Sequence, residues 1–510
     1  MTTESAAGRI AGGYAVEGQA LELGTVVIDG NADPSAQIRI PLATVNRHGL
    51  VAGATGTGKT KTLQLIAEQL SAAGVPVLMA DVKGDLSGLS RPGEANDKTA
   101  ARAKDTGDNW VATGFPVEFL SLGTEGLGVP IRATVASFGP VLLSKVLGLN
   151  ATQESTLGLI FHWAKENNRP LITLDQLRNV ISHLTSDEGK ADLKSLGGVS
   201  STTAGVILRS LVNLEGEGGD TFFGEPKLDP HDLLRVNNQN HGTISLLEFS
   251  GQSLRPVIFS TFLMWLLADL FKELPEVGDI DKPKLVFFFD EAHLLFTDAS
   301  KAFLDQVEQT VKLIRSKGVG VFFCTQLPTD LPNDVLSQLG ARIQHALRAF
   351  TPDDQKALSK TVRTYPKTDV YDLESALTSL GIGEAVVTVL SEKGAPTPVA
   401  WTRMRVPRSL MGAIDTDEIA KAAKDSPLQA KYGQTVQQPS EPEVRQPAPP
   451  SPEAPAPPTG HEIPPMPEPF EPKGPAMWEE VLQNPTVKSG INTAIREVVK
   501  NLFGTGRRRK

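Results

Sequence analysis

A short glycine-rich segment constrains the fold of this chain more than any other part. Gly53–Thr60 has the sequence GATGTGKT and lies between the apolar run HGLVA and the helix-forming stretch KTLQLIAEQL. Glycines at these positions let backbone N–H groups turn inward around phosphate oxygens, and the N-terminus of the following helix adds partial positive charge. The pattern G-x-x-x-x-G-K-[ST] between a strand and a helix predicts a P-loop; the alternative is a glycine-rich turn that matches by accident.

Every residue of this loop is a candidate ligand for a nucleotide. Lys59 is expected to reach the β- and γ-phosphates, and the Thr60 hydroxyl is expected to coordinate a metal ion. ATP and Mg²⁺ are therefore the predicted cofactors. The predicted nucleotide-binding residues are Gly53, Ala54, Thr55, Gly56, Thr57, Gly58, Lys59 and Thr60.

A second motif is an apolar run that ends in two adjacent acids. Lys284–His293 has the sequence KLVFFFDEAH, which is typical of a strand buried on both faces. In P-loop folds an acid at a strand end holds the Mg²⁺ shell, and an adjacent glutamate can polarise the attacking water. We therefore assign Asp290 to the metal and Glu291 to the catalytic base. The alternative is an acidic strand-to-helix turn in which Asp290 caps the next helix.

The letters DEAH also occur in a large superfamily of helicases with tandem motor domains. Those helicases need a Ser-Ala-Thr motif and a second motor domain with the element Q-x-x-G-R-x-G-R, and this chain contains neither. His293 is therefore interpreted as a residue of the first helical turn, with a role in catalytic coupling as the alternative.

A third apolar run, within GVGVFFCTQLPTDLP, ends in the polar pair Thr325 and Gln326. Because the carboxyl ends of parallel strands meet at one edge of a sheet, Gln326 is expected beside the γ-phosphate or its attacking water. A hydrogen bond from the strand end to the following loop is the alternative.

Arginines near these strands are candidates for a charge offered to a neighbouring subunit's nucleotide. Arg315 precedes the third run and is expected opposite the nucleotide edge of its own subunit, a position that suits action in trans. The segment RIQHAL is predicted to be a strand. Arg342, its first residue, and Arg348, which directly follows it, compete for the same role, and a plain surface arginine is an equal alternative. Asp81 in MADVKGDLSG is either a neighbour of the metal site or a turn former.

Apolar runs alternate with helical stretches from His48 onward, which predicts an α/β fold with a mostly parallel sheet covered by helices. A short β element is expected over 1–46 and a P-loop ATPase domain over 47–436, with a helical insertion at about 135–240. A disordered proline-rich linker is expected over 437–476. An amphipathic helix with a basic end is expected over 477–510.

The charge balance excludes one broad class of function. The 510 residues include 50 Lys and Arg against 59 Asp and Glu, a formal charge of −9, all of it carried by residues 1–436 because the linker and the final helix cancel. This excludes a generally basic protein that coats nucleic acid, although a locally basic channel is still allowed.

Two further features bear on the compartment. The single cysteine, Cys324, cannot form an internal disulfide, which suits a reducing compartment. The longest apolar run, Val257–Leu267, is shorter than the ~20 residues that a membrane span needs. We therefore expect a cytoplasmic protein without a transmembrane segment, in which this run forms a buried helix.

Together these segments resemble the HerA-like helicase C-terminal domain proteins of the DUF853 group, in the HerA-FtsK branch of P-loop ATPases. The resemblance covers about residues 20–410 and rests on GATGTGKT, MADVKGDLSGLS, FFFDEAHLLF, VKLIRSKGVGVFFCTQLPTDLP and QLGARIQHALRAFTPDDQKAL. It implies a RecA-like core, ATP hydrolysis and a hexameric ring. By extension from better-studied relatives, it implies movement of double-stranded DNA through that ring.

The resemblance also implies roles for single residues. Lys59 and Thr60 match the Walker A positions, and Asp290 and Glu291 match the Walker B acids. In the same way Gln326 matches the family's polar sensor, and Arg315 matches the basic segment from which relatives supply an arginine in trans. HerA has a full N-terminal β-barrel that docks a nuclease, whereas about 46 residues precede the P-loop strand here, which weakens the expectation of a nuclease partner and of duplex unwinding.

The leading hypothesis is an ATP-driven ring motor that acts on DNA as a translocase or helicase. One alternative is an assembly or secretion-type ATPase with a protein partner, which an acidic body suits equally well. Another is a nucleotide-gated scaffold that recruits an unknown protein partner through its proline-rich tail or final helix. Cations that could face a pore are Arg102, Lys104, Lys190 and Lys194, although solvated surface charges are the simpler interpretation.

Overall fold

The computed structural model describes residues 5–81, 84–124, 126–192, 197–248, 256–278, 280–297 and 299–434. The predicted disordered linker over 437–476 and the predicted C-terminal helix over 477–510 lie outside these residues. Lys194, a candidate pore cation, lies outside them as well.

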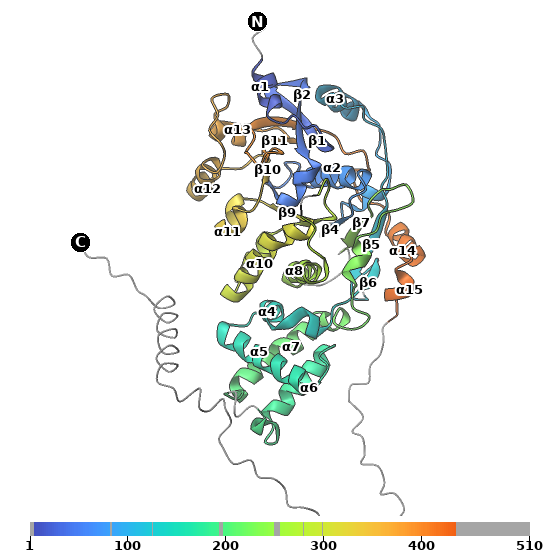
Figure 1. The fold of residues 1–510 in the computed structure, drawn as a ribbon, viewed down its shortest axis with the longest axis vertical. Coiled ribbons are helices and arrows are strands. Elements are labelled where there is room, and N and C mark those ends of the chain that lie inside the picture. The colour runs from blue at the N-terminus through green and yellow to red at the C-terminus, as the bar shows by residue number, and fades with distance from the viewer. Residues whose placement is uncertain are drawn as a thin grey trace, which may run out of the picture. The chain divides into compact units, whose positions relative to one another are not determined.

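One large sheet forms the centre of the described chain (Figure 1). It has 12 strands in the order β2-β1-β12-β11-β10-β3-β9-β8-β4-β7-β5-β6. Neighbours pair in parallel from β10 to β6 and antiparallel from β2 to β10. This confirms the predicted α/β fold with a mostly parallel sheet. The strands are β1 Ala20–Ile28, β2 Asn31–Pro41, β3 Gly49–Ala52, β4 Val77–Asp81, β5 Val117–Leu122, β6 Val129–Ile131, β7 Ile244–Glu248, β8 Leu285–Phe289, β9 Val319–Thr325, β10 Ala341–Gln344, β11 Glu384–Thr388 and β12 Ala400–Met404.

The central strands are buried on both faces, as their unbroken apolar sequences predict. Successive side chains of a strand point to opposite faces, so Leu50 and Val51 of β3 enter two different cores. Leu50 shares one core with α8 and α10, whereas Val51 shares the other with α2. The helices are α1 Ala6–Gly12, α2 Lys59–Ala72, α3 Asp97–Thr106, α4 Val135–Leu147, α5 Ala151–Glu166, α6 Leu174–Thr185, α7 Ser201–Gly216, α8 Pro256–Glu273, α9 His293–Phe296, α10 Lys301–Ile314, α11 Asn333–Leu336, α12 Pro352–Val362, α13 Leu373–Ser379, α14 Thr416–Asp425 and α15 Gln429–Tyr432.

The four helices α4 to α7 occupy the segment in which the sequence predicts a helical insertion (Figure 1). Local capping explains where they start. Thr134, Asn150 and Thr173 each form a capping box, and the Ser200 side chain accepts from the backbone N–H of Thr203. The buried residues of these helices join the same apolar core as α8, which places the insertion on the face of the sheet that α8 and α10 cover.

Helix α8 contains the apolar run Val257–Leu267, which confirms the predicted helix. Phe262, Leu263, Met264 and Trp265 are each at most 1 % exposed. Among the described residues, no helix combines the length and apolar character that crossing a membrane requires.

The N-terminal β element joins the central sheet rather than packing apart from it. Strand β1 pairs with β12 through Gly24 and Met404. A Cβ atom on Gly24 would lie 2.0 Å from the Arg403 carbonyl oxygen, so only glycine permits this approach. Tyr14 adds hydrogen bonds from its hydroxyl to the Val387 and Pro398 carbonyls, at 2.8 and 2.6 Å. The start of the chain is thereby tied to β11 and β12.

The parallel strands bring the predicted motifs to one edge of the sheet. In the register of β3 with β9, Ala52 is level with Thr325, and in that of β8 with β9, Phe289 is level with Phe323. The residues after β3, β9 and β8 therefore emerge side by side, with β9 between the P-loop strand and the strand of the two acids.

Candidate functional site

The P-loop begins directly after β3 and ends at Thr60, the second residue of α2. Gly53, Gly56 and Gly58 have φ angles of 151°, 81° and 116°, which side chains disfavour. A Cβ atom on Gly53 would also lie 2.6 Å from Cβ of His345. The glycines thus permit the backbone path that exposes the loop N–H groups to an anion at the helix N-terminus.

The Lys59 ammonium folds back over this loop. Its Nζ donates to the Gly53 carbonyl at 2.7 Å and to the Ala54 carbonyl at 3.2 Å. The Thr57 hydroxyl donates to the same Ala54 carbonyl at 2.7 Å, which stiffens the turn. Thr60 lies in the first turn of α2, one residue after Lys59. The predicted cation and hydroxyl therefore both lie at the N-terminus of α2.

The two acids follow β8 in an unusual backbone conformation. Glu291 has a φ of 47°, the left-handed region that non-glycine residues rarely occupy. The Asp290 carboxylate accepts from the Glu291 N–H at 2.9 Å, and the Ala292 N–H donates to the Cys324 carbonyl at 2.9 Å. These contacts hold the sharp turn and attach it to β9. Strained backbone of this kind concentrates at functional sites.

Buried Cys324 links the acids to the P-loop lysine. Burial raises the pKa of its thiol, the charge of Asp290 raises that pKa further, and Lys59 lowers it. The Cys324 side chain is also hydrogen-bonded to Asp290. Cys324 is level with Val51 of β3, and its neighbour Phe323 is level with Phe289 of β8, so the segments that carry Lys59 and Asp290 leave the sheet on either side of the end of β9.

Gln326 lies at the same edge, with its side chain exposed. It lines a cavity of about 430 Å³ together with His293 and Asp330. The Asp330 carboxylate accepts from the Thr325 hydroxyl at 2.7 Å and from the Leu327 N–H at 2.9 Å, so it is Thr325, not the Gln326 side chain, that bonds to the following loop. His293 Nδ1 is 3.5 Å from Glu291 Oε2, which puts the histidine beside the candidate base although it belongs to the first turn of α9.

His345 is a site residue that the sequence does not single out. It follows β10, is fully buried, and its Nδ1 lies 2.8 Å from the Glu384 carbonyl. Nδ1 must therefore carry the proton, so Nε2 accepts from the Thr62 hydroxyl at 2.9 Å. Burial lowers the pKa of His345 to about 4, and the charge of Lys59 lowers it as well. A neutral histidine thus joins α2 to β11 beneath the P-loop.

The three candidate arginines lie in different places. Arg315 is exposed at the end of α10. The pKa of His48, just before β3, is lowered chiefly by the burial of that histidine and also by the charge of Arg315. Arg315 precedes β9 and therefore lies at the edge of the sheet opposite the P-loop. Arg342 donates to the Thr364 carbonyl at 3.0 Å, whereas Arg348 donates to the Thr55 carbonyl of its own P-loop at 3.3 Å.

Asp81 makes the contacts of a turn former. It is 1 % exposed at the end of β4 and accepts from the Asp85 and Leu86 N–H groups at 3.0 and 2.7 Å. Burial raises the pKa of its carboxyl. Arg102, named above as a pore candidate, donates to the carbonyls of Ile382, Gly383 and Met404 and so holds neighbouring backbone in place.

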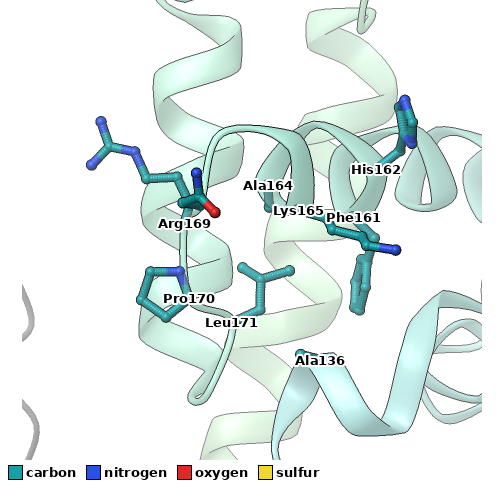
Figure 2. Close-up of a pocket in the computed structure, with 9 residues that line it drawn as sticks. Ala136, Phe161, His162, Ala164, Lys165, Arg169, Pro170 and Leu171 are labelled. Carbon is teal, nitrogen blue, oxygen red and sulfur yellow. The ribbon is translucent and has the colours of Figure 1, made fainter.

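A separate pocket of about 500 Å³ lies in the helical insertion (Figure 2). Its apolar floor includes Phe161, Leu171 and Ala136, and Lys165 and Arg169 stand at its rim. No P-loop residue lines this pocket, so it is not part of the nucleotide site.

Comparison with known proteins decides the family. The model of the Helicase HerA-like C-terminal family matches residues 27–510. The chain belongs to the Helicase HerA-like C-terminal family. This agrees with the resemblance drawn from the motifs. A curated relative, the DNA double-strand break repair helicase HerA of Saccharolobus solfataricus, is 22 % identical over 380 residues, which cover 73 % of this chain and 67 % of that protein.

A solved structure shares the fold of this HerA-like chain. The plasmid coupling protein TrwB, in complex with ADP and Mg²⁺, matches with a TM-score of 0.50 and 16 % sequence identity, covering 80 % of this chain and 94 % of that one. VirB4 of Thermoanaerobacter pseudethanolicus matches with a TM-score of 0.46 and 13 % identity, covering 76 % of this chain and 97 % of that one.

Proposed function

We propose that this HerA-like chain binds ATP with Mg²⁺ at Gly53–Thr60 and hydrolyses it. The observation that carries the proposal is the convergence of the P-loop lysine and the acidic pair across the end of β9. The P-loop follows β3 and the acids follow β8, with only β9 between the two strands at this edge, and Glu291 follows Asp290 in a strained turn. A phosphate-binding loop, a metal-binding acid and an adjacent glutamate are the parts that phosphoryl transfer to water needs.

The residues present fit a Mg²⁺ ion of the kind used in phosphoryl transfer. Among the described residues there is no cluster of three or more His, Cys, Asp or Glu side chains that would hold a metal unaided. Mg²⁺ in such sites is held by one or two protein oxygens together with substrate phosphates, and Thr60 and Asp290 supply oxygens of that type. When bound, the ion would neutralise charge on the β- and γ-phosphates.

The remaining roles follow from position. Lys59 pairs with the terminal phosphates, for which its present bonds to the Gly53 and Ala54 carbonyls must yield. Glu291 orients and polarises the attacking water, and Gln326 senses the terminal phosphate from the adjacent strand end. His293, 3.5 Å from Glu291, is placed to hold that carboxylate until nucleotide is bound.

A pair of matched variants tests the hydrolytic assignment. Glu291→Gln keeps the size of the side chain but removes its basicity, so it should lower ATP turnover at least a hundredfold while ATP still binds. Lys59→Ala should weaken ATP binding itself. Turnover by Glu291→Gln at the wild-type rate would contradict the role given to this carboxylate.

We further propose that the protein works as a ring, hexameric by family resemblance, that moves double-stranded DNA. The acidic composition requires any DNA contact to be local. Lys165, in the last turn of α5, and Arg169, just after this helix, are exposed cations that line the pocket of the helical insertion (Figure 2). The double variant Lys165→Glu, Arg169→Glu should reduce the stimulation of ATP turnover by duplex DNA. Stimulation equal to that of the wild type would remove this surface from the proposal.

A protein partner is the second candidate substrate. The observation that favours it is the formal charge of −9 on residues 1–436, which repels nucleic acid over most of the surface. ATP turnover that duplex DNA leaves unchanged at low salt would support this candidate over DNA. An absence of turnover in the wild type would instead favour the nucleotide-gated scaffold.

A further inference from the structure

A pocket of about 360 Å³ opens beside the P-loop on the side away from the acids. Gly58 of the P-loop and Lys61 and Thr62 of α2 form one wall. The opposite walls come from α3, from the turn before β11 and from the segment that follows β12. The lining residues on those walls are Asn96, Lys98, Thr99, Arg102, Ile382, Gly383, Met404, Arg405, Val406, Pro407 and Met411.

The strand order fixes how this pocket relates to a bound triphosphate. In the sequence β11-β10-β3-β9-β8, the acids after β8 lie on one side of the P-loop strand and the pocket lies on the other. The γ-phosphate belongs on the acid side, because Asp290 and Glu291 act there. The α-phosphate, the ribose and the base then extend past Lys61 and Thr62, toward the pocket.

The two arginines of the pocket, Lys61 and the side-chain oxygen of Asn96 are already engaged by the protein, Lys61 through Gln64 Oε1 at 3.2 Å. The Lys98 side chain is exposed in the first turn of α3. The Arg102 guanidinium donates to the Gly383, Ile382 and Met404 carbonyls at 3.0, 3.1 and 3.4 Å. Arg405 donates to Asp108, Glu22 and Gln37. The side-chain oxygen of Asn96 accepts from Thr99 as the cap of α3.

Aliphatic and thioether surface makes up much of the rest. Ile382 is 77 % exposed and Met411 is 44 % exposed, although both side chains are large and apolar. Met404, Val406 and Pro407 line the pocket beside them. Such surfaces can cover the faces of a flat ring, but they offer no hydrogen bonds to its edges.

The pocket walls are fixed to the P-loop before any ligand binds. The Gly383 N–H donates to the Thr57 carbonyl of the P-loop at 3.1 Å. On the other wall, Glu68 of α2 accepts from the Arg408 N–H at 2.7 Å and from the Ser409 N–H at 3.2 Å, and so holds the segment that carries Met411. A preformed slot loses little ordering free energy when a ligand enters.

We propose that this pocket holds the purine ring of the nucleotide and contacts its faces rather than its edges, so that ATP and GTP bind with similar affinity. The inference rests on the proposed function, because it takes the P-loop to hold a triphosphate. Sites that hydrogen-bond the edges of a ligand reject analogues by several orders of magnitude, whereas contacts to a ring face are common to both purines.

The test measures the binding of ATP, GTP and inorganic tripolyphosphate, each with Mg²⁺, to the full chain. The double variant Ile382→Ala, Met411→Ala removes apolar area that the ring would cover, and should weaken ATP and GTP binding roughly tenfold. Tripolyphosphate has no ring and should bind the variant and the wild type equally. Val212→Ala, which shortens an aliphatic side chain that is 53 % exposed on α7, is the matched control and should change nothing.

The outcomes separate this inference from the function on which it rests. Wild-type Kd values for ATP and GTP within about threefold of each other, with selective loss in the double variant, support the purine pocket. Unchanged ATP binding by the double variant overturns it while leaving the P-loop assignment standing, and so does a wild-type preference of a hundredfold for one purine. A wild type that binds neither ATP nor tripolyphosphate overturns the proposed function and the pocket together.

Discussion

Glu291 shows at the scale of one residue how backbone conformation and chemistry are combined. Its φ of 47° is sterically unfavourable for a residue with a side chain, whereas glycine adopts it freely. The sequence identified this glutamate from the acidic pair at the end of an apolar run. It could not predict the conformation, because the turn is held by contacts to β9, such as that of the Ala292 N–H with the Cys324 carbonyl.

We predict that Glu291→Gly is more stable than Glu291→Ala by about 1 kcal/mol. Both substitutions remove the carboxylate, but only glycine relieves the strain of the left-handed backbone. Urea unfolding of the two variants measures the difference. Equal stability, or a more stable alanine variant, would show that the turn is not strained at this residue.

His345 is the residue that sequence reasoning missed. A lone histidine at the end of a strand has no spacing pattern, and its partners Thr62 and Glu384 are distant in sequence. Only the fold brings α2, β10 and β11 together around it. The strand itself was predicted from RIQHAL. The hydrogen bonds of His345 to Thr62 and to the Glu384 carbonyl were not.

We predict that His345 makes stability depend on pH. Its folded-state pKa of about 4 lies below the ordinary 6.5, so the unfolded chain takes up this proton first as the pH falls. The stability of the wild type relative to His345→Gln should therefore decline between pH 6.5 and 4, by about 3 kcal/mol in total. Unfolding free energies measured at several pH values give the difference, in which the contributions of His48 and Glu68 cancel. A difference that does not change with pH would contradict the buried, neutral state.

Helix α2 serves two purposes at the scale of the element. Its N-terminus carries Lys59 and Thr60, and further along the helix Glu68 accepts from the Arg408 N–H, the Ser409 N–H and the Ser409 hydroxyl. Burial raises the pKa of Glu68 to about 7. The sequence predicted the helix from KTLQLIAEQL. It could not predict this contact, because residues 68 and 409 meet only through the fold.

Glu68→Ala should destabilise the protein by about 2–3 kcal/mol, because it leaves buried N–H groups without an acceptor. The matched control is Glu418→Ala, which removes an exposed ion pair with Arg91 and should cost at most about 1 kcal/mol. Thermal or urea unfolding compares the two variants. Equal effects would show that Glu68 does not anchor the segment after β12.

At the scale of the whole molecule, the sequence predicted which residues lie at one edge of the sheet better than it predicted the order of the strands. The strand-end rule placed the P-loop, the acids and Gln326 at one edge, and these residues do emerge together. The position of β9 between β3 and β8, and the pairing of β1 with β12, depend on long-range packing that local patterns do not encode. Strand β6, Val129–Ile131, was not predicted because three residues are too few to show a period.

Arg315 and Arg348 lie at opposite edges of the sheet, so variants of the two can show whether an arginine acts on the nucleotide of its own subunit or on that of a neighbour. Arg315 lies near the start of β3, whereas Arg348 contacts the P-loop of its own subunit. We predict that Arg315→Ala and Lys59→Ala each lower turnover by at least about a hundredfold, and that mixing the two variants restores part of it. Mixed rings contain interfaces with an intact lysine on one subunit and an intact Arg315 on the next.

The same mixing experiment with Arg348→Ala is the control. Arg348 and Lys59 belong to one site of one subunit, so a mixture of these two variants assembles no complete site and should recover nothing. Recovery with Arg348→Ala, or none with Arg315→Ala, would assign the trans-acting arginine differently.

The central claim is that ATP hydrolysis at this P-loop drives movement along DNA. The most direct test is steady-state ATP turnover of the full chain with Mg²⁺, measured without DNA, with duplex DNA and with single-stranded DNA over a range of salt concentrations. We predict turnover that Glu291→Gln abolishes and that duplex DNA stimulates severalfold at low salt, with the stimulation falling steeply as salt rises. Turnover that duplex DNA leaves unchanged at every salt concentration would contradict the claim.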